Sequence, residues 1–371
     1  MSTVLINIDE GEIPGDNEDE KRETLKEWSK FNLSNYYSSF EGLTPRTEFV
    51  TMTFEECKSL LKALRNPNLK EEHDIDNMKS LTKRMEKAFK SIGGEKFFVK
   101  LNSRSAKDAV DKVPNRLQPL LEKQLEIVKQ KRSLSTDLVA LRRSMFESMS
   151  ISSCKEALDV FSYSYRIVSD LKRSLTFEDL YDQQIIVRQF LDWDIKYEFR
   201  GWVTNGKLNA LSQYYSNCFF DYGEEINAIK EKITKFVDQN LQESLKMFPK
   251  AVVDFGIDQD KNVFVVELNP FSSLTGCCLF EWEKDQKTLT SGELEFRYRT
   301  EPRSDKYLVA LMSPWARLFP QNLQEKDEKK ENGEQNKLKK QKKKKKQKKK
   351  KKQKQKQKKN SKKDSNDCTI C

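Results

Sequence analysis

The sequence predicts an α+β fold. Strand-like runs and amphipathic helical runs follow one another without strict strand–helix–strand alternation. Two hairpin signals lie in the second half of the chain, and 371 residues are enough to bury a sizeable core. No apolar run approaches the length of a membrane span. We divide the chain into an acidic disordered N-terminus (1–30), an N-terminal subdomain with a helical elaboration (31–180), a C-terminal subdomain (181–318) and a disordered lysine-rich tail (319–371).

The first half of the chain alternates between short strands and helices. A capping box is expected at Thr53, because Glu56 follows three residues later. Lys100 lies on a short apolar strand that precedes a loop of small polar residues. The predicted elements are a strand over 48–52, the helix that Thr53 begins, a helix over 77–92 that stops at Gly93 and Gly94, the strand with Lys100, and a charged helical region over 116–150 that the segment 162–171 closes.

The second half contains two predicted hairpins. A strand over 185–190 carries Arg188. Asn205-Gly206, a strong short turn signal, predicts a hairpin over 197–215. A long amphipathic helix is expected over 224–247, followed by a second hairpin over 252–271 that turns within 258–262.

The second hairpin places polar side chains together on one face. With the loop centred on Asp260-Lys261, Asp254 lies opposite Glu267, and Asn269 shares the face of Glu267 because side chains alternate along a strand. The opposite face is expected to be core and collects Val253, Phe255, Ile257, Phe264, Val266 and Leu268. Facing carboxylates destabilise a sheet unless they are neutralised, and Mg²⁺ prefers such oxygen ligands. The alternative is a solvated polar face on a half-buried hairpin.

Four other strand residues fit the same chemistry. Lys100 and Arg188 interrupt apolar strands, Glu198 and Arg200 share a strand face, and Gln213 falls opposite Glu198 if Asn205-Gly206 is the turn. Cationic side chains near a magnesium-type carboxylate site are what a nucleoside triphosphate requires. Taken singly, each cation could be a strand-edge charge that reaches water. The chain has no Walker A run and no GxGxxG motif.

These residues also carry a family resemblance. In this order, FFVKLNSRSAKDA, SYSYRIVSDL, IIVRQFLDWDIKYEFRGWV, LSQYY, VVDFGIDQDKNVFVVELNPF, LFEWE and LEFRYR resemble the cell division cycle protein 123 family, over about residues 31–318. The resemblance implies an ATP-grasp-like fold, in which ATP lies between two α+β subdomains. It further implies an ATP- and Mg²⁺-binding chaperone that assembles eukaryotic translation initiation factor 2 through its gamma subunit, in support of translation initiation and cell cycle progression.

The resemblance assigns a role to each matched residue. It implies phosphate contacts from Lys100 and Arg188, adenine contacts from the backbone of Gln189 and Phe190, pocket-lining roles for Glu198 and Arg200, and Mg²⁺ ligation by Asp254, Glu267 and Asn269. The loop with Ser103, Ser105 and Lys107 would cover the nucleotide. The family usually has Trp-Ser-Ala-Pro-Arg there, so the aromatic is missing, and Lys107 cannot make the bidentate contact of an arginine. Glu267 stands where Asp is more usual.

The chain's basic charge is confined to its tail. The whole chain carries +11, but 337–363 contains 19 lysines and no acid, which leaves −8 for the rest. The last four residues, from Cys368 to Cys371, fit the C-a-a-X prenylation pattern, and a polybasic neighbour supplies the second signal for an anionic membrane. Such a lysine run can instead associate non-specifically with RNA or serve nuclear import.

Three hypotheses remain open at this point. The first is the assembly chaperone, the second an ATP-grasp ligase that joins a carboxylate to an amine, and the third a membrane-recruited scaffold that uses only the tail. Seven cysteines without metal-type spacing and the single His73 predict a reduced intracellular protein without a zinc site. We expect a cytoplasmic monomer that becomes peripheral on membranes if Cys368 is lipidated.

Overall fold

The computed structural model describes residues 12–66 and 68–319. The chain divides into two compact units, Met1–Leu308 and Val309–Cys371. Both sheets belong to the first unit. In the second unit, the described residues complete helix α11 (Asp305–Met312) and form the 3-10 helix η5 (Ser313–Leu318). The lysine-rich run and Cys368 lie outside the described residues, so the predicted disorder and lipidation of the tail stay predictions.

The prediction of disorder over 1–30 is wrong for helix α1 (Glu18–Ser29). Asn17 caps this helix by accepting a hydrogen bond from the Glu20 N–H. Arg22 ties it to a distant segment, since its guanidinium pairs with Asp179 at 2.7 Å and lies 4.3 Å from the centre of the Phe177 ring. A polar composition therefore hid a helix that tertiary contacts and a cap stabilise.

The first sheet has four antiparallel strands in the order β1-β4-β2-β3. Register pairs Arg188 with Phe98 on one side and with Thr47 on the other, so these three side chains share a face with Lys100. The strands are β1 (Thr47–Thr51), β4 (Gln184–Gln189), β2 (Phe97–Leu101) and β3 (Ser150–Ile151).

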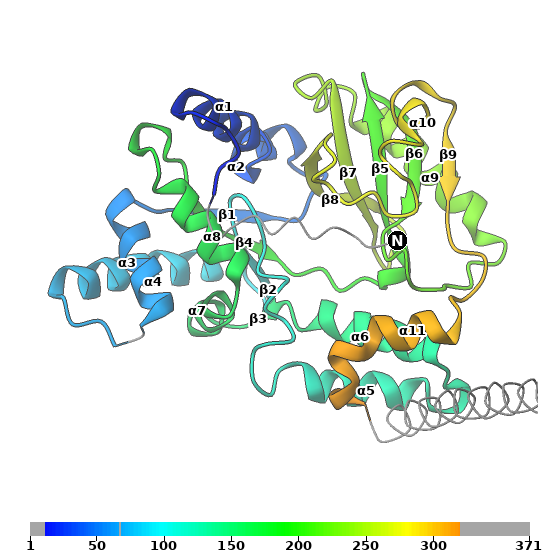
Figure 1. Ribbon diagram of the computed structural model, residues 1–371, viewed down its shortest axis with the longest axis horizontal. Helices are drawn as coiled ribbons and strands as arrows, with labels where there is room; N and C mark the ends of the chain where they lie inside the picture. The colour runs from blue at the N-terminus through cyan, green and yellow to red at the C-terminus, as the bar shows by residue number, and fades with distance from the viewer. Residues whose placement is uncertain (1–11, 67, 320–371) are drawn as a thin grey trace, which may run out of the picture. The chain divides into compact units, whose positions relative to one another are not determined.

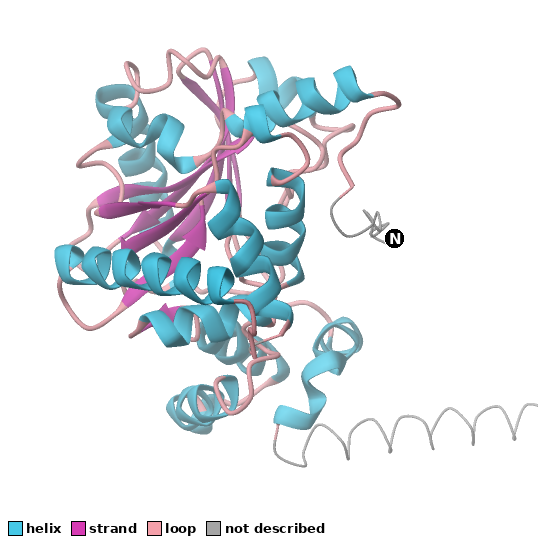
Figure 2. Ribbon diagram, turned by 90° about the vertical axis from the view of Figure 1, so that its left-hand side faces the viewer, coloured by secondary structure: helices cyan, strands magenta, loops and turns pink. Residues whose placement is uncertain are grey.

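The opposite face of this sheet packs on helices and forms the main core. Helices lie against this face of the sheet in Figures 1 and 2. Strand residues such as Val99, Leu101 and Val187 are buried there, in one hydrophobic cluster with helical side chains such as Leu60 and Leu81. The capping box of Thr53 and Glu56 is present as predicted. The helices are α3 (Phe54–Arg65), α4 (Glu72–Ile92), α7 (Cys154–Ser162) and α8 (Tyr165–Ser174).

Shorter elements connect these layers. The charged region over 116–150 is helical as predicted, and it folds as a pair of packed helices. These connecting elements are α2 (Leu33–Tyr36), η1 (Tyr37–Phe40), α5 (Leu117–Ile127), η2 (Lys129–Lys131), α6 (Leu134–Glu147), η3 (Glu178–Leu180) and η4 (Ile195–Tyr197).

The second sheet has five strands in the order β8-β7-β5-β6-β9, of which only β6 and β9 pair in parallel. Helix α9 (Glu225–Asn240) covers one face with Ile226, Ile229, Ile233 and Val237, and α10 (Gln286–Ser291) lies near the other face. The strands are β5 (Glu198–Thr204), β6 (Lys207–Gln213), β7 (Lys250–Ile257), β8 (Val263–Pro270) and β9 (Glu295–Arg297).

Two β-bulges change predicted side-chain positions. The pairing of β5 with β6 shifts between Trp202 and Val203, so Gln213 lies opposite Phe199 and not opposite Glu198 as predicted. The pairing of β7 with β8 shifts between Asp254 and Phe255, which turns Phe264 away from the predicted core face and toward Gly256. A bulge adds one residue to one strand and reverses the facing of the residues beyond it.

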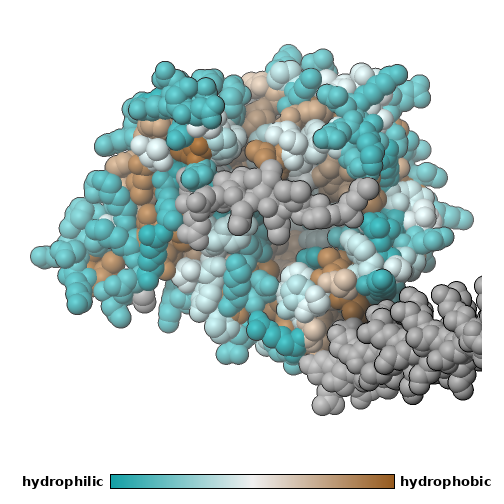
Figure 3. All heavy atoms as spheres, viewed as in Figure 1, coloured by the Kyte–Doolittle hydropathy of each residue, from teal (hydrophilic) through white to brown (hydrophobic). Residues whose placement is uncertain are grey.

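The α+β class is confirmed, but the predicted subdomain boundary at 180/181 is misplaced. Strand β4 follows that boundary and yet lies in the middle of the first sheet, between β1 and β2. Within the described part of the chain, no helix is long and apolar enough to cross a membrane. The face shown in Figure 3 is mostly hydrophilic, with hydrophobic residues in small groups between hydrophilic ones.

Candidate functional site

A buried ion pair lies on the site-facing side of the second sheet. Arg200 on β5 donates from Nε and Nη2 to both oxygens of Asp254 on β7, at 2.7 and 2.8 Å. Asn269 on β8 donates its amide N–H to the same carboxylate at 3.0 Å. Asp254 lies opposite both Arg200 and Glu267 in the register, as predicted for the hairpin. The sheet therefore neutralises Asp254 with its own arginine.

A second ion pair joins the two sheets. The Lys100 ammonium on β2 donates to Glu267 Oε1 on β8 at 2.5 Å. Burial raises the pKa of Glu267, but the charge and hydrogen bond of Lys100 outweigh it and lower that pKa to about 2. Glu267 is thus a carboxylate at every physiological pH. It and its partner Lys100 each lie on a paired strand, Glu267 on β8 and Lys100 on β2.

Arg188 is buried without a carboxylate partner. Its guanidinium donates to Thr47 Oγ1, Thr44 Oγ1 and the carbonyl of Val266, at 3.1, 2.6 and 2.9 Å. Among the described residues no acid lies within ion-pair distance of it, and burial lowers its pKa. An arginine keeps its charge in proteins, so Arg188 brings an uncompensated positive charge to this place.

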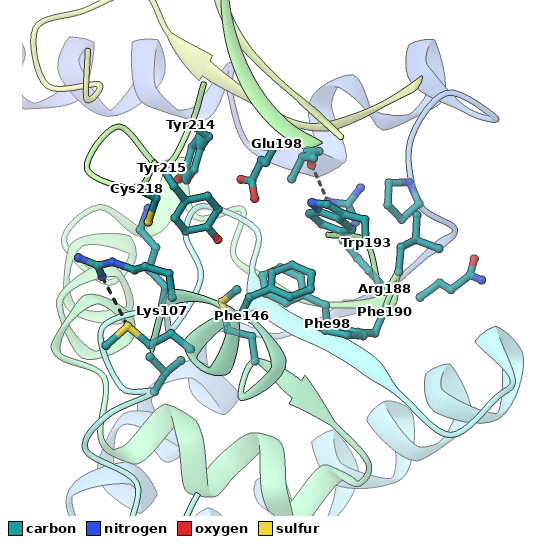
Figure 4. A pocket seen from close by; sticks show the side chains of 18 of the residues that line it. Phe98, Lys107, Phe146, Arg188, Phe190, Trp193, Glu198, Tyr214, Tyr215 and Cys218 are labelled. Carbon is teal, nitrogen blue, oxygen red and sulfur yellow. Dashed lines mark hydrogen bonds between the residues drawn. The ribbon is translucent and has the colours of Figure 1, made fainter. Parts of the chain in front are cut away.

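A cavity of about 390 Å³ opens beside these residues (Figure 4). Its walls are mainly aromatic and thioether side chains, and this volume is in the range of small-molecule sites. Figure 4 shows the Glu198 carboxyl pointing into the space between Tyr215 and the aromatic side chains below it. The lining includes Phe98, Lys107, Arg142, Met145, Phe146, Met149, Arg188, Gln189, Phe190, Trp193, Glu198, Tyr214, Tyr215 and Cys218.

Glu198 is a carboxyl group that burial keeps protonated. It is 7 % exposed, and no hydrogen bond or ion pair engages its carboxyl among the described residues. Burial, reinforced by the nearby Asp254 charge, raises the pKa of Glu198 to about 8. At neutral pH the group is therefore mostly a neutral donor and acceptor inside an apolar cavity.

Lys107 provides a second cation without a carboxylate partner. It lines the cavity, and its side chain is exposed to solvent there. One guanidinium nitrogen of Arg166 is buried with no hydrogen-bond partner. The loop before α5 thus delivers a cation to the cavity, as its sequence suggested.

Some predicted site residues lie elsewhere. Ser103 donates to Asp170 at 2.6 Å, and Ser105 forms an isolated bridge with Lys100, so neither lines the cavity. Gln189 and Phe190 do line it, but their N–H groups bond to the carbonyls of Arg46 and Lys96. The remaining predicted residues either line the cavity or border it through the two ion pairs.

The balance of charge at the site favours an anionic ligand. Lys100 is paired with Glu267, and Arg200 with Asp254. Arg188 and Lys107 lack an acid in the described part of the chain, and Glu198 is mostly neutral. A buried charge is normally paired, so the buried Arg188 without an acid favours a negatively charged ligand here, and the exposed ammonium of Lys107 adds to the positive charge of the cavity.

The oxygen groups on β7 and β8 are chemically suited to a hard divalent cation. Each carboxylate oxygen has two lone pairs, so Asp254 and Glu267 can serve a metal in addition to their present donors, and Asn269 has a free amide oxygen. Within the described residues, no group of three or more His, Cys, Asp or Glu side chains forms a metal site. A metal here would need the amide or a phosphate to complete its shell.

The sequence did not reveal the aromatic walls. Helix α6 contributes Arg142, Met145 and Phe146, and Met149 follows it, so the helical region after Arg116 builds part of the site. Tyr214 and Tyr215 follow β6 directly, within a motif of the family resemblance. The helical spacing of the apolar α6 residues predicts a buried face, but no local signal distinguishes a face that meets a cavity from one that meets a core.

Comparisons with known proteins bear on this site. A protein-family model described as D123 matches residues 143–360, more than half of the chain. The chain belongs to the D123 family. The family predicted from the sequence is thereby confirmed, because curated relatives carry the name that the resemblance suggested.

The curated relatives of this D123 protein match it over short segments. "Translation initiation factor eIF2 assembly protein" of Candida albicans is 26 % identical over 117 residues, 31 % of this chain and 34 % of the relative. "Cell division cycle protein 123" of Candida glabrata is 33 % identical over 107 residues, 28 % of this chain and 29 % of the relative. The matches thus span about a third of the length of these relatives.

A solved structure shares the fold of this D123 protein. The structure of Cdc123 from Schizosaccharomyces pombe superposes with a TM-score of 0.54 at 19 % identity, over 74 % of this chain and 98 % of that chain. The ATP-grasp-like class expected from the sequence is consistent with this likeness. At that identity the likeness concerns the fold alone.

Proposed function

We propose that this protein is an ATP- and Mg²⁺-binding assembly chaperone for eukaryotic translation initiation factor 2. One observation carries the nucleotide part. An aromatic cavity of about 390 Å³ is lined by two cations, the buried Arg188 and the exposed Lys107, that have no carboxylate partner among the described residues. A purine ring suits the aromatic walls, and a triphosphate supplies the negative charge that the cations lack.

Each part of the nucleotide has a place in this proposal. Phe98, Phe146 and Trp193 hold the base, and the neutral carboxyl of Glu198 hydrogen-bonds a ligand hydroxyl group. Lys107 and Arg188 contact the phosphates. Asp254, Glu267 and Asn269 hold Mg²⁺, which supplies charge neutralisation of the phosphates when it is bound.

The assembly role is proposed from the relatives. Several of them are named translation initiation factor eIF2 assembly protein. We infer that this chain acts on the same factor, through its gamma subunit. ATP then serves as a structural ligand that joins the two sheets around the cavity, and no turnover is required.

The test is association with the purified gamma subunit, with and without ATP and Mg²⁺. Immobilised gamma subunit should retain more full-length protein when ATP is present, without sustained release of ADP. Lys107→Gln should lose the ATP effect, whereas Lys235→Gln, which removes an exposed charge on α9, should keep it. Sustained ADP release that a small carboxylate or amine stimulates would contradict the chaperone and favour a ligase.

A further inference from the structure

A second pocket lies between residues 279 and 307 and is separate in its lining from the nucleotide cavity. It is an open hollow of about 720 Å³. The polar side chains around it are mostly arginines, and the apolar ones are mostly aromatic. Its lining comprises Leu279, Phe296, Arg297, Tyr298, Arg299, Thr300, Glu301, Pro302, Arg303, Ser304 and Tyr307.

The three arginines of this pocket differ in their partners. Arg297 is neutralised, because Asp285 accepts from both of its terminal nitrogens at 2.8 Å and Glu295 accepts from Nε at 2.6 Å. Arg299 and Arg303 have no acid within ion-pair distance in the described part of the chain. Glu301 lines the same pocket but forms no ion pair there. Two of the three positive charges are therefore available to a ligand.

The surroundings hold these two arginines in place. Arg299 donates its backbone N–H to Gln213 Oε1 at 2.7 Å and its Nε to the Ser216 carbonyl at 3.0 Å. Arg303 stacks on the Tyr307 ring, 4.7 Å from its centre, and its Nε is buried without a hydrogen-bond partner. Burial, and then repulsion by Arg303, lower the pKa of Arg299. An anion between the two guanidinium groups would relieve both the repulsion and the missing hydrogen bond.

The pocket shares a wall with the nucleotide cavity. The segment 214–218 lines the cavity, and the Ser216 carbonyl within it accepts the hydrogen bond from Arg299. Asn217 in the same segment accepts a hydrogen bond from the Tyr307 hydroxyl at 2.8 Å. A ligand at the arginines therefore lies one loop away from the cavity.

The aromatic residues of the pocket are poor platforms for stacking bases. Arg303 covers one face of the Tyr307 ring. Tyr298 packs against Tyr222 and Phe296, with ring centres 5.9 and 5.6 Å apart. Single-stranded nucleic acids need free ring faces along an extended basic track, whereas here two arginines stand together in one hollow. A guanidinium fork pairs with a carboxylate through two parallel hydrogen bonds, which the acidic side chains of a polypeptide can supply.

We propose that the pocket around Arg299 and Arg303 docks an acidic peptide segment of a protein partner, through carboxylate groups that pair with both guanidinium groups. This goes beyond the proposed function and does not depend on nucleotide binding. A protein partner bound here would contact the loop that also forms the nucleotide cavity.

The test locates a bound probe on the full-length protein, because the lysine-rich tail also attracts anions. An end-capped oligoglutamate peptide with a benzophenone group is irradiated with the protein, and the crosslinked segments are identified by mass spectrometry. Crosslinks are expected within 296–307, in addition to those on the tail. An oligoglutamine probe of the same length should give none within 296–307.

Variants connect those crosslinks to the two arginines. Arg303→Gln should reduce the crosslinks within 296–307 about tenfold, which corresponds to the loss of one charge-assisted hydrogen-bonded pair. Arg303→Lys keeps the charge but loses the bidentate guanidinium group, so its crosslinking within 296–307 should lie between that of wild type and that of Arg303→Gln. The control variants Lys207→Gln and Lys235→Gln, at exposed positions, should leave the crosslinks within 296–307 unchanged. Because Nε of Arg303 makes no hydrogen bond, thermal unfolding should be close to that of the wild type.

Two results would overturn the proposal. Crosslinks confined to 337–363, or unchanged within 296–307 in a folded Arg303→Gln protein, would show that the pocket does not bind acidic peptide. In a competition experiment, oligothymidylate and unlabelled oligoglutamate are each added before irradiation. If oligothymidylate removes the crosslinks within 296–307 at a lower concentration than oligoglutamate does, the pocket binds nucleic acid. Binding of ATP is measured separately, so failure here leaves the proposed function untouched.

Discussion

Glu198 illustrates how the environment of one residue changes its chemistry. On the sequence it is one acid among many, two positions from Arg200 on the same strand face. In the structure Arg200 is engaged by Asp254, which leaves the Glu198 carboxyl in a mainly apolar cavity without an ion-pair partner among the described residues. Burial then raises its pKa to about 8. The same residue that could have been an anion is therefore a neutral hydrogen-bonding group.

This shift predicts a pH dependence of stability. Between the ordinary pKa of 4.5 and about 8, the folded protein retains the Glu198 proton that the unfolded chain has lost. The unfolded state binds fewer protons in this window, so the free energy of unfolding falls as pH rises and levels off above pH 8. Each pH unit costs at most ~1.4 kcal/mol, and the total is a few kcal/mol.

Glu198→Gln should remove this dependence. Urea unfolding at several pH values gives the difference in free energy of unfolding between wild type and variant. The stability of the variant relative to the wild type should increase as the pH rises from about 4.5 to 8. Glu243→Gln, at an exposed position, is the control and should show no such trend. A constant difference for Glu198→Gln across the window would mean that the carboxyl titrates normally.

Asp254 is the residue for which the structure changes the design of experiments most. The predicted hairpin placed Asp254 and Glu267 on its polar face, opposite the expected core. Asp254 is in fact 2 % exposed, and its removal would leave Arg200 buried and unpaired. Breaking such a pair costs about 3–5 kcal/mol of stability. A loss of Mg²⁺ binding in Asp254→Ala could therefore come from unfolding as well as from the missing carboxylate. Glu267→Gln is the safer variant.

At the scale of elements, the second hairpin shows where prediction from sequence succeeds and where it fails. The alternation of side chains along each strand, with the predicted turn, correctly placed Asp254 opposite Glu267 and put Asn269 on the same face as Glu267. It failed for Phe264 because no sequence signal marks the bulge between Asp254 and Phe255. The bulge brings Phe264 next to Trp193, with ring centres 5.2 Å apart, and so shapes the cavity wall.

The bulged hairpin requires glycine at position 256. A Cβ there would lie 2.3 Å from the Phe264 ring. Gly256→Ala should therefore lower the free energy of unfolding by about 1–3 kcal/mol, since the ring must move in a packed wall. In the double variant with Phe264→Leu the loss should be smaller than the sum of the two single losses. Thermal or urea unfolding measures this, and a Gly256→Ala protein as stable as wild type would contradict the packing described.

At the scale of the whole molecule, the sequence predicted the polar half of the site and not the apolar half. Charged residues on strands are conspicuous, so Lys100, Arg188, Glu198 and Arg200 were found. The aromatic walls come from segments far apart in the chain, such as α6 and the loop after β6, and only the fold brings them together. Helix α1 was missed for a related reason, because its stabilising partner Asp179 is distant in sequence.

The central claim is that the cavity binds ATP through an apolar half and a cationic half. Isothermal titration calorimetry of the full-length protein tests it most directly, with ATP·Mg²⁺ and adenosine as ligands of wild type, Lys107→Gln and the control Lys235→Gln. We predict that Lys107→Gln weakens ATP·Mg²⁺ binding about tenfold and leaves adenosine binding unchanged, because only ATP reaches the cation. Absence of ATP·Mg²⁺ binding by folded wild-type protein, or an equal loss for both ligands, would contradict the account.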